Sequence, residues 1–397
     1  MFNNTSDQFK LIFVSCFNFK GTGTVRILLI PDKFKGSLTA RQVIDALKKG
    51  ISAYDPSIEF EECIASDGGD GFLDAIAETH RVDKINTLSV DPLGRKIDTF
   101  YYTQHKTAYI ELANASGLAL LGSEERNVLK SSTYGTGLQI ADALDKGIEE
   151  FFIGLGGSAT NDGGMGIAVA LGYRFLDRNA KELEPIGENL QFIDKIVQPD
   201  TSKFLNSTFF AVNDVKNPLF GSNGAALVYG KQKGADKKAL ALLDQGLRNL
   251  HTKVKEQLKI DASHLPGSGA AGGVAYGLKV FFNAEFISGI NFILQNNDIH
   301  NKLNDSQIDL IITGEGKIDK QTTQGKLIDG ITAIGKNYKI PVLAVCGTNE
   351  LTFSDREKMG VHAIIEIRDD SKSLEYTLNN ASELLQKSIN QYFKDNY

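Results

Sequence analysis

Acidic and basic residues that could bind a phosphate group and a metal ion occur together in short glycine-rich segments of the 397-residue chain. Residues 65–72, ASDGGDGF, place two aspartates around paired glycines. Residues 32–37, DKFKGS, and 314–319, GEGKID, add lysines and further carboxylates. Backbone N–H groups and lysines bind phosphate oxygens, and one or two carboxylates can hold a hydrated Mg²⁺ ion. These segments therefore favour a phosphate–magnesium site.

Each of these segments follows a predicted strand of a parallel sheet. Residues 24–32 contain a continuous apolar run, which is typical of a strand that is covered on both faces. A helical pattern follows at 38–51, and strands are predicted at 57–65, 308–313 and 340–346, the last of them running into GTNE. Open parallel sheets bind ligands at the carboxyl ends of their strands. If both ends of the chain build one sheet, all four strand ends lie at one edge.

This edge supplies candidates for two roles. The residues expected to bind phosphate or nucleotide are lysines and glycines at the strand ends, namely Lys33, Lys35, Gly68, Gly69, Gly314, Gly316 and Lys317. The residues expected to hold the metal are the carboxylates Asp67, Asp70 and Glu315. Each loop taken singly could instead be a polar turn that caps a helix, but the four together favour a site.

The region 75–300 contains apolar strand-like segments and glycine-rich stretches, and it contributes further candidates. Residues 154–164, GLGGSATNDGG, follow a predicted strand and are interpreted as a substrate-facing loop. Asp214 directly follows the strand STFFAV, where it could hold substrate hydroxyls or a metal, or form an Asx turn. Lys231 and Lys233 are expected to be solvated, yet they stay phosphate candidates because they follow the apolar segment GAALVYG, which is predicted to be a strand.

Two other glycine motifs are rejected. Residues 330–337, GITAIGKN, lack the Ser or Thr of a Walker A loop and lead into a strand instead of following one. Residues 267–272, GSGAAG, match the dinucleotide-binding pattern, but no strand precedes them. The chain is expected to end in a strand at 362–367 and one long amphipathic helix from about 372 to 393.

Composition restricts the partners and the compartment. The net charge of −6 argues against a nucleic-acid partner. Three widely spaced cysteines form no disulfide or zinc pattern and favour a cytoplasmic location. No apolar run approaches the roughly 18 residues that a membrane span needs, so no membrane partner is expected. Residues 11–19, LIFVSCFNF, lack the flanks of a signal peptide, and residues 1–24 are expected to be a poorly ordered extension.

Six segments in order along the chain resemble the bacterial type I glycerate kinases: ILLIPDKFKGSLTA, ASDGGDGFLDAI, GLGGSATNDGGMGIAVALGYRFLD, DVKNPLFG, PGSGAAGGVAYGL and DLIITGEGKIDKQTTQGK. The resemblance runs from about Arg26 to the C-terminal helix. It implies an α/β fold with two α/β domains. A Rossmann-like parallel-sheet domain would be built from both chain ends, 25–72 and 295–397, with a second α/β domain, 73–294, inserted into it. The resemblance also implies that the substrate lies in a cleft between these domains, and it leaves a homodimer open.

The implied activity is the phosphorylation of D-glycerate by ATP with Mg²⁺, at the 2-hydroxyl group. The transfer needs a carboxylate that accepts the hydroxyl proton, and the candidates are Asp319 first and Asp67 second. The residues expected to bind the substrate are Ser158, Asn161, Asp162, Asp214 and Ser268. Three alternatives stay open: formation of 3-phosphoglycerate, a kinase for another small hydroxy acid, and a non-catalytic sensor of sugar acids.

Overall fold

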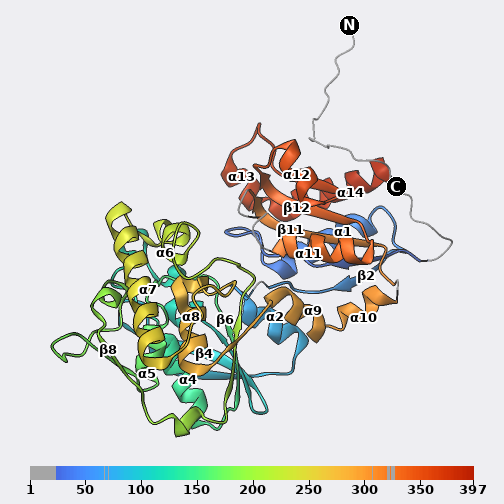
Figure 1. The fold of residues 1–397 in the computed structure, drawn as a ribbon. Helices are drawn as coiled ribbons and strands as arrows, with labels where there is room; N and C mark the ends of the chain where they lie inside the picture. The colour runs from blue at the N-terminus through green and yellow to red at the C-terminus, as the bar shows by residue number, and fades with distance from the viewer. Residues whose placement is uncertain (1–23, 67, 70, 306, 320–321, 323–326) are drawn as a thin grey trace. The chain divides into compact units, whose positions relative to one another are not determined.

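The chain folds into two units, which are shown in Figure 1. The computed structural model describes residues 24–66, 68–69, 71–305, 307–319, 322 and 327–397. Unit 1 comprises the described chain up to Ala65 together with Phe292–Tyr397, and unit 2 comprises Ser66–Asn291. Asp67, Asp70 and all but the last residue of the predicted extension lie outside the described residues. The first boundary between the units precedes the paired glycines, so Gly68 and Gly69 belong to unit 2.

Unit 1 is built on a parallel sheet of five strands, which confirms that both chain ends contribute to one sheet. The strands are β1 (Arg26–Leu29), β2 (Glu59–Glu62), β11 (Leu310–Ile318), β12 (Val342–Asn349) and β13 (Ala363–Glu366), in the spatial order β13-β12-β11-β1-β2. Every pairing is parallel, and the central one aligns Ile27 with Leu310. The apolar run that predicted β1 is buried on both faces, as expected of such a strand. The four predicted carboxyl ends therefore share one edge of this sheet.

Two strands of unit 1 extend further than predicted. β11 continues through the segment GEGKI, where a loop was expected after residue 313, and β12 continues into GTN. Their pairing runs on to Ile318 opposite Asn349. A Cβ at Gly314 would lie 2.3 Å from the carbonyl oxygen of Val345, so glycine is what lets the two strands lie this close. The chemistry-bearing residues 314–318 are thus strand residues at the edge, and the loop begins at Asp319.

The helices of unit 1 follow from capping and apolar spacing. Thr39 and Gln42 form a capping box at the start of α1 (Ala40–Ser52), whose apolar face is buried. A Cβ at Gly50 of this helix would lie 2.4 Å from the Ile389 side chain of α14 (Ala381–Asn396), so the two helices pack closely. The other helices are α10 (Ile299–Asn304), α11 (Leu327–Tyr338) and α12 (Phe353–Met359).

The single C-terminal helix predicted at 372–393 is wrong in one respect, because the segment is divided into α13 (Leu374–Asn379) and α14. Ser373 caps α13 by accepting a hydrogen bond from the Tyr376 backbone N–H. Asn380 donates its side-chain N–H to the Tyr376 carbonyl. Asparagine side chains that bond to nearby backbone compete with the helical ladder, and the break falls at this residue.

Unit 2 is built on a mixed six-stranded sheet with the order β10-β9-β6-β5-β4-β3. Its strands are β3 (Asp83–Val90), β4 (Lys96–Gln104), β5 (Thr107–Glu111), β6 (Glu150–Gly154), β9 (Thr208–Val212) and β10 (Glu285–Ile287). β3, β4 and β5 are antiparallel neighbours, and the pairings from β5 to β10 are parallel. β7 (Arg174–Leu176) and β8 (Lys195–Val197) form a separate ribbon. Stacked aromatic side chains such as Phe151 and Phe209, with ring centroids 4.8 Å apart, fill the core.

The helices of this unit are α2 (Phe72–Thr79), α3 (Ala113–Ser116), α4 (Tyr134–Asp145), α5 (Met165–Ala170), α6 (Ala225–Tyr229), α7 (Lys237–Leu258) and α8 (Ala270–Phe282), while α9 (Gly289–Asn296) runs across the division between the units. The predicted strand in GAALVYG is wrong, because these residues form α6. Short apolar runs do not by themselves distinguish a strand from a buried helix, and Ala225 and Ala226 are buried.

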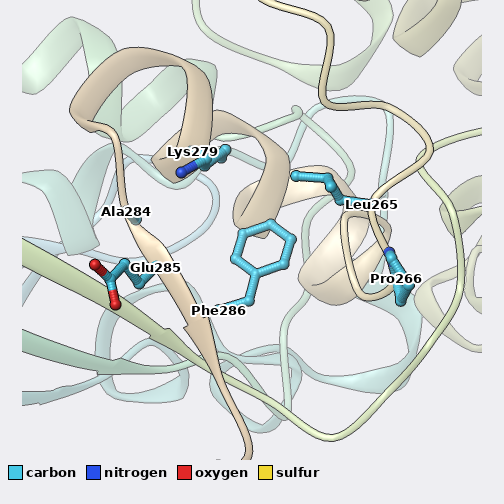
Figure 2. A pocket seen from close by; sticks show the side chains of 6 residues that line it. All are labelled: Leu265, Pro266, Lys279, Ala284, Glu285 and Phe286. Carbon is cyan, nitrogen blue, oxygen red and sulfur yellow. The ribbon is translucent and has the colours of Figure 1, made fainter.

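An open pocket of about 350 Å³ lies in unit 2, lined by Leu265, Pro266, Lys279, Ala284, Glu285 and Phe286. Figure 2 shows the Phe286 ring in the middle of this set, with Lys279 on α8. None of the residues predicted to bind substrate, phosphate or metal lines this pocket.

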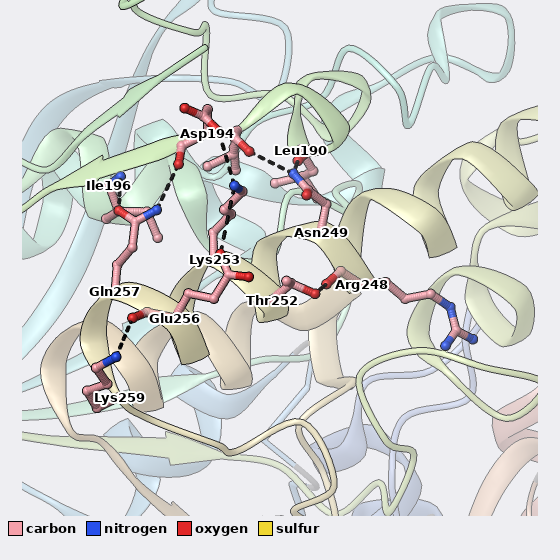
Figure 3. Close-up of polar contacts among 11 residues, drawn as sticks. Leu190, Asp194, Ile196, Arg248, Asn249, Thr252, Lys253, Glu256, Gln257 and Lys259 are labelled. Atoms are coloured by element: carbon pink, nitrogen blue, oxygen red, sulfur yellow. Dashed lines mark hydrogen bonds and ion pairs between the residues drawn. The ribbon is translucent and has the colours of Figure 1, made fainter. Parts of the chain in front are cut away.

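The second half of α7 is fixed to the chain segment that precedes and contains β8 (Figure 3). The Asn249 side chain donates hydrogen bonds of 2.9 Å to the carbonyls of Leu190 and Ile193. Lys253 pairs with Asp194, and the Gln257 side chain accepts from the Ile196 backbone N–H. These contacts hold the longest helix of the described chain in place beside β8. None of the described helices is both long and apolar enough to cross a membrane.

Candidate functional site

In unit 1, the segment that follows β1 forms a tight turn beside β11. Phe34 and Leu38 pair across this turn, and Gly36 has a φ of +79°, in the left-handed region that favours glycine. A Cβ at Gly316 would lie 3.0 Å from the backbone nitrogen of Lys35, so glycine allows β11 to approach the turn. Lys33 is half-buried and Lys35 is exposed. Both predicted lysines and Gly316 are thus brought to the same edge of the sheet.

A threonine that the sequence analysis did not select connects two of the predicted acidic residues. The Thr322 hydroxyl donates a 2.6 Å hydrogen bond to Oε1 of Glu315. The same hydroxyl accepts a hydrogen bond from the Asp319 backbone N–H, and the Thr322 N–H donates to the Asp319 carbonyl. Thr322 is completely buried. Glu315 and Asp319 therefore belong to one hydrogen-bonded turn at the end of β11. The Asp-x-x-Thr spacing of Asp319 and Thr322 is the sequence feature that indicates such a turn.

The predicted ends of β11 and β12 also meet in an ion pair. Lys317 Nζ lies 2.9 Å from Oε2 of Glu350, and both side chains are exposed. The hydrogen bond that Lys317 donates to Glu350 raises the pKa of Lys317, so this lysine keeps its charge at neutral pH. An exposed pair contributes little to stability, but it keeps the ammonium at the edge of the sheet.

In unit 2, the paired glycines of the ASDGGDGF segment approach the protein's own backbone. Gly68 has a φ of +79°, and a Cβ there would lie 2.3 Å from the Val212 carbonyl oxygen. The Gly156 N–H donates to the Gly68 carbonyl, and a Cβ at Gly156 would lie 2.0 Å from the Cα of Gly69. The glycines are therefore required where this segment packs on the ends of β6 and β9. Their predicted contact with phosphate stays a proposal.

The N-terminus of α2, which follows these glycines, is capped by a distant carboxylate. Oε2 of Glu111, at the end of β5, accepts hydrogen bonds of 3.2 Å from the backbone N–H groups of Gly71 and Leu73. Glu111 is buried and was not selected from the sequence. A carboxylate at a helix N-terminus satisfies unpaired N–H groups and interacts favourably with the helix dipole. This contact fixes where the acidic segment enters α2.

The predicted substrate-facing loop contains a buried lysine contact. Lys233 Nζ donates hydrogen bonds of 2.7 Å to Oγ of Ser158 and to the Thr160 carbonyl. Lys233 is only 3% exposed, so the expectation that it is solvated is wrong. Burial lowers its pKa to about 7, although the charge of Asp162 acts in the opposite direction. The lysine follows a helix, and it reaches a loop more than seventy residues earlier in the chain.

Asp162 organises the end of the same loop. Its carboxylate is fully buried and accepts hydrogen bonds from the backbone and hydroxyl of Thr133 and from the N–H groups of Gly164 and Gly166. Burial raises the pKa of Asp162, and these hydrogen bonds oppose that shift. The geometry gives this aspartate a positioning role in the loop, and a direct contact with substrate stays a prediction.

A third glycine-rich segment contacts two of the predicted loops. Ala271, Gly272 and Gly273, at the start of α8, all have positive φ values. A Cβ at Gly272 would lie 2.1 Å from the Thr160 carbonyl oxygen. The Gly269 N–H donates to the Asn217 carbonyl, three residues after Asp214. The loops that hold Ser158, Asn161, Asp214 and Ser268 are therefore neighbours within unit 2.

The other two candidates in these loops have local partners. The Asp214 carboxylate accepts hydrogen bonds from the Ser288 hydroxyl (2.6 Å) and the Ile290 N–H (3.0 Å), at the start of α9. The Ser268 hydroxyl is completely buried and donates to the carbonyls of Ser263 and Leu265. These contacts position the loops, and the predicted contacts with substrate stay proposals.

A metal site was predicted on three carboxylates, and only Glu315 is among the described residues. Within the described part of the chain, His, Cys, Asp and Glu side chains form no cluster of three or more that could hold a metal ion. The Glu315 carboxylate is a hard oxygen donor of the kind that Mg²⁺ takes. Mg²⁺ in kinase sites is held by one or two carboxylates and by the phosphates of the substrate, so a single carboxylate at this edge fits that pattern.

The parallel sheet of unit 1, with lysines and carboxylates on glycine backbone at its carboxyl edge, has the features of an enzyme that transfers phosphoryl groups. The family model of the glycerate kinase family matches residues 27–395. The chain belongs to this family and is a kinase.

Individual relatives agree with the family model over almost the whole chain. The glycerate kinase of Halalkalibacterium halodurans is 37% identical over 368 residues, which cover 91% of this chain and 96% of the relative. The glycerate 2-kinase of Escherichia coli is 34% identical over 346 residues, 86% of this chain and 90% of the relative. A crystal structure from Salmonella typhimurium LT2, of a protein assigned as glycerate kinase 2, has a TM-score of 0.76 at 33% identity. It covers 94% of this chain and 98% of that chain, which confirms the two-domain α/β fold class.

Proposed function

We propose that this protein transfers the γ-phosphoryl group of ATP to the 2-hydroxyl group of D-glycerate, giving 2-phosphoglycerate and ADP. The choice of the 2-hydroxyl group rests on the similarity, over 86% of the chain, to a relative named glycerate 2-kinase. The motifs that hold the predicted site residues all fall inside the matched range 27–395. Cytoplasmic location is part of the proposal and is supported by the widely spaced cysteines.

In this proposal, the unit 1 edge handles the phosphates and the proton. Lys33, Lys35 and Lys317, with the backbone at Gly314 and Gly316, neutralise and orient the phosphate groups. The backbone at Gly68 and Gly69 of unit 2 is kept as a separate phosphate-binding candidate. Asp319 accepts the proton of the attacking hydroxyl, with Asp67 as the second candidate. Its hydrogen bonds with Thr322 support this role, because they fix the backbone from which the Asp319 carboxylate projects.

Mg²⁺ is part of the proposal, with Glu315, Asp67 and Asp70 as the residues that would hold it. When bound, the ion supplies charge neutralisation between the phosphate oxygens. The Glu315 carboxylate is oriented by the Thr322 hydroxyl, as carboxylates that bind metals commonly are by a neighbouring hydrogen-bond donor.

The acceptor binds to residues of unit 2 in this proposal: Ser158, Asn161, Asp162, Asp214 and Ser268. Support comes from their grouping on loops that contact one another through Gly269 and Gly272. Asp162 contributes by holding the loop in shape, as its four hydrogen bonds indicate.

A coupled assay of ADP release tests the proposal, run with D-glycerate, L-glycerate, glycolate, lactate and tartronate in the presence of ATP and Mg²⁺. D-glycerate should be the preferred acceptor, and ³¹P and ¹H NMR of the product should show phosphate on the C2 oxygen. Phosphate on the C3 oxygen, or preference for another acid, would support the corresponding alternative. A protein that binds D-glycerate without releasing ADP would instead be a sensor.

A further inference from the structure

The ammonium group of Lys233 is buried without a carboxylate in contact. It is 3% exposed, and its two hydrogen bonds go to neutral acceptors, Oγ of Ser158 and the carbonyl oxygen of Thr160. Among the described residues, no carboxylate lies within ion-pair distance of Lys233. The carboxylate of Asp162 accepts hydrogen bonds from Thr133 and from backbone N–H groups instead. In its protonated form, Lys233 has three N–H donors, so one donor remains for another partner.

The residues next to this lysine carry buried polar atoms that also lack partners. Oγ1 of Thr160 and both polar atoms of the Asn161 side chain, Nδ2 and Oδ1, make no hydrogen bond within the described part of the protein. Thr160 is completely buried and Asn161 is 1% exposed. Buried polar groups in proteins are normally paired, because an unpaired one loses its hydration without compensation. Four donors and acceptors therefore lack partners on Thr160, on Asn161, which follows it in the sequence, and on Lys233, which binds the Thr160 carbonyl, and together they point to a ligand.

The backbone that carries these groups is held in place from two directions. Lys233 binds the Thr160 carbonyl. On another side, a Cβ at Gly272 would lie 2.1 Å from the same carbonyl oxygen and 2.6 Å from the Asn161 Cα, so Gly272 packs directly on this backbone. The Gly163 N–H also donates to the Gly272 carbonyl. The backbone of residues 160–161 is therefore held on two sides, which limits how far it can shift to give these side chains other partners.

We propose that Lys233, Thr160 and Asn161 form the subsite that binds the carboxylate of the 2-hydroxy acid acceptor. This inference rests on the proposed function, and it adds Lys233 and Thr160 to the residues that recognise the substrate. The Lys233 N–H, the Thr160 hydroxyl and the Asn161 amide N–H can all donate to carboxylate oxygens, and hydrogen bonds between charged groups are the strong ones. The Asn161 Oδ1 atom can accept a hydrogen bond from a hydroxyl of the acceptor.

The charge of this subsite suits a small monoanion better than a nucleotide polyphosphate. Lys233 supplies one positive charge, and its other partners are neutral. A buried charge is stabilised when an opposite charge and hydrogen bonds complete its surroundings, and one carboxylate matches one ammonium. The low pKa of Lys233 agrees with an ammonium that lacks an anionic partner, and a bound carboxylate would favour its charged form. Because the groups are buried, the acceptor must displace the side chains that cover them.

The first test measures melting temperature, because the inference predicts that removing a buried hydroxyl will not destabilise the ligand-free protein. Thr160→Val keeps the shape and removes a hydroxyl that has no partner, so the ligand-free variant should melt at the same or a higher temperature than the wild type. The rise in melting temperature caused by D-glycerate should be smaller in this variant. Thr136→Val is the matched control, because the equally buried Thr136 hydroxyl bonds with Ser116 and the Leu112 carbonyl. That variant should melt at a lower temperature.

The second test uses kinetics. Lys233→Met should raise the KM for D-glycerate about tenfold or more, with the KM for ATP within about twofold of wild type. The wild type should discriminate strongly against glyceramide, which has no carboxylate, and Lys233→Met should lose most of that discrimination. Lys237→Met, four residues later at an exposed position, should change neither value.

The outcomes separate this inference from the proposed function. A folded Lys233→Met variant with an unchanged KM for D-glycerate, or with the loss confined to ATP, overturns the subsite while glycerate kinase activity stands. If Lys233→Met does not fold, Thr160→Val decides the matter: destabilisation of the ligand-free variant with an undiminished response to D-glycerate refutes the subsite. If the wild type does not phosphorylate D-glycerate, the proposed function fails. Calorimetry with D-glycerate alone then tests the subsite. If the subsite exists, Thr160→Val must bind D-glycerate more weakly than the wild type does, and equal binding refutes it.

Discussion

The hydroxyl group of Thr322 donates a 2.6 Å hydrogen bond to Glu315 and accepts another from the backbone N–H of Asp319. One buried hydroxyl thus orients a proposed metal-binding carboxylate and fixes the backbone of the proposed base. The relationship gives Thr322 a role in positioning both groups.

Thr322→Val is expected to lower turnover about tenfold or more and to raise the Mg²⁺ concentration needed for half-maximal rate, because such supporting residues contribute about 10–100-fold to metal affinity or activity. A magnesium titration at saturating ATP and D-glycerate measures both effects. The control is Thr332→Val in α11, whose hydroxyl bonds to the carbonyls of its own helix. If both variants respond equally, the effect comes from general packing and not from the Glu315–Asp319 turn.

Asp319→Asn is expected to reduce kcat by about 10²–10⁴-fold, since that is the typical contribution of a positioned general base. The amide keeps the size of the side chain, so the KM for D-glycerate should change little. Steady-state kinetics with both substrates varied make this comparison. A loss that high Mg²⁺ partly restores would mean that Asp319 binds the metal, and full activity would remove Asp319 from the mechanism.

The double change Asp67→Asn, Asp70→Asn is expected to abolish magnesium-dependent turnover while the protein remains folded. The two aspartates lie in the segment that leads into α2 at Phe72, where their carboxylates would repel a bare phosphate but could hold one together with Mg²⁺. If the segment only caps α2, the double variant should instead lose about 0.5–2 kcal/mol of stability and keep ordinary activity. Thermal melts beside a magnesium titration distinguish the two results.

Gly156→Ala is expected to destabilise unit 2 by about 1–3 kcal/mol or more, because the new methyl group would lie 2.0 Å from the Cα of Gly69 and the backbone must move to admit it. The free energy of unfolding from urea titration measures the loss. Gly122→Ala is the control, since the nearest atom there is 3.5 Å away and belongs to the Glu125 side chain. A stable Gly156→Ala variant would show that the Gly68–Gly69 segment can shift without cost.

The stability of the protein should rise with pH between about 7 and 10 through Lys233. Burial holds the pKa of Lys233 at about 7 in the folded state, against an unfolded value of about 10.4. Between these values the unfolded chain binds a proton at this site that the folded protein has released, so the free energy of unfolding increases with pH. This contribution is lost as the pH falls through 7.

Urea titrations at several pH values test this expectation by comparison with Lys233→Met, which lacks the titrating group. The difference in free energy of unfolding between the wild type and the variant should change in favour of the wild type as the pH rises from 7 to 10. The exposed neighbour provides the control, and Lys231→Met should give a profile parallel to the wild type. Parallel profiles for Lys233→Met as well would contradict a low pKa for Lys233.

The sheet of unit 1 could be predicted because its signals are local. The apolar run at Ile27–Ile30 and the helix that follows are readable from spacing. The pairing of β1 with β11 joins segments 283 residues apart and was not predicted. The extent of β11 could not be read in the same way. Glycines at 314 and 316 indicate a loop in a sequence, whereas in the structure they admit the neighbouring backbone of Val345 and Lys35.

The site was predicted less completely, because its decisive contacts are tertiary. Lys233 is surrounded by polar and glycine residues in the sequence, and nothing near it indicates burial against Ser158 and Thr160. The segment predicted as a strand before Lys233 is the helix α6, and neither assignment indicates that Lys233 is buried. Glu111 was missed for the same reason, since it caps a helix about forty residues away.

The order of strands in unit 1 has a consequence for synthesis on the ribosome. Ile27 of β1 pairs with Leu310 of β11. One hydrogen-bonding edge of β1 therefore has no partner until residues 283 positions further along the chain have been synthesised. Ser66–Asn291 is one continuous stretch and can complete its own contacts in the meantime. We therefore expect the middle of the chain to fold first, while the nascent N-terminal strand must be kept from aggregating until the last quarter of the protein has emerged.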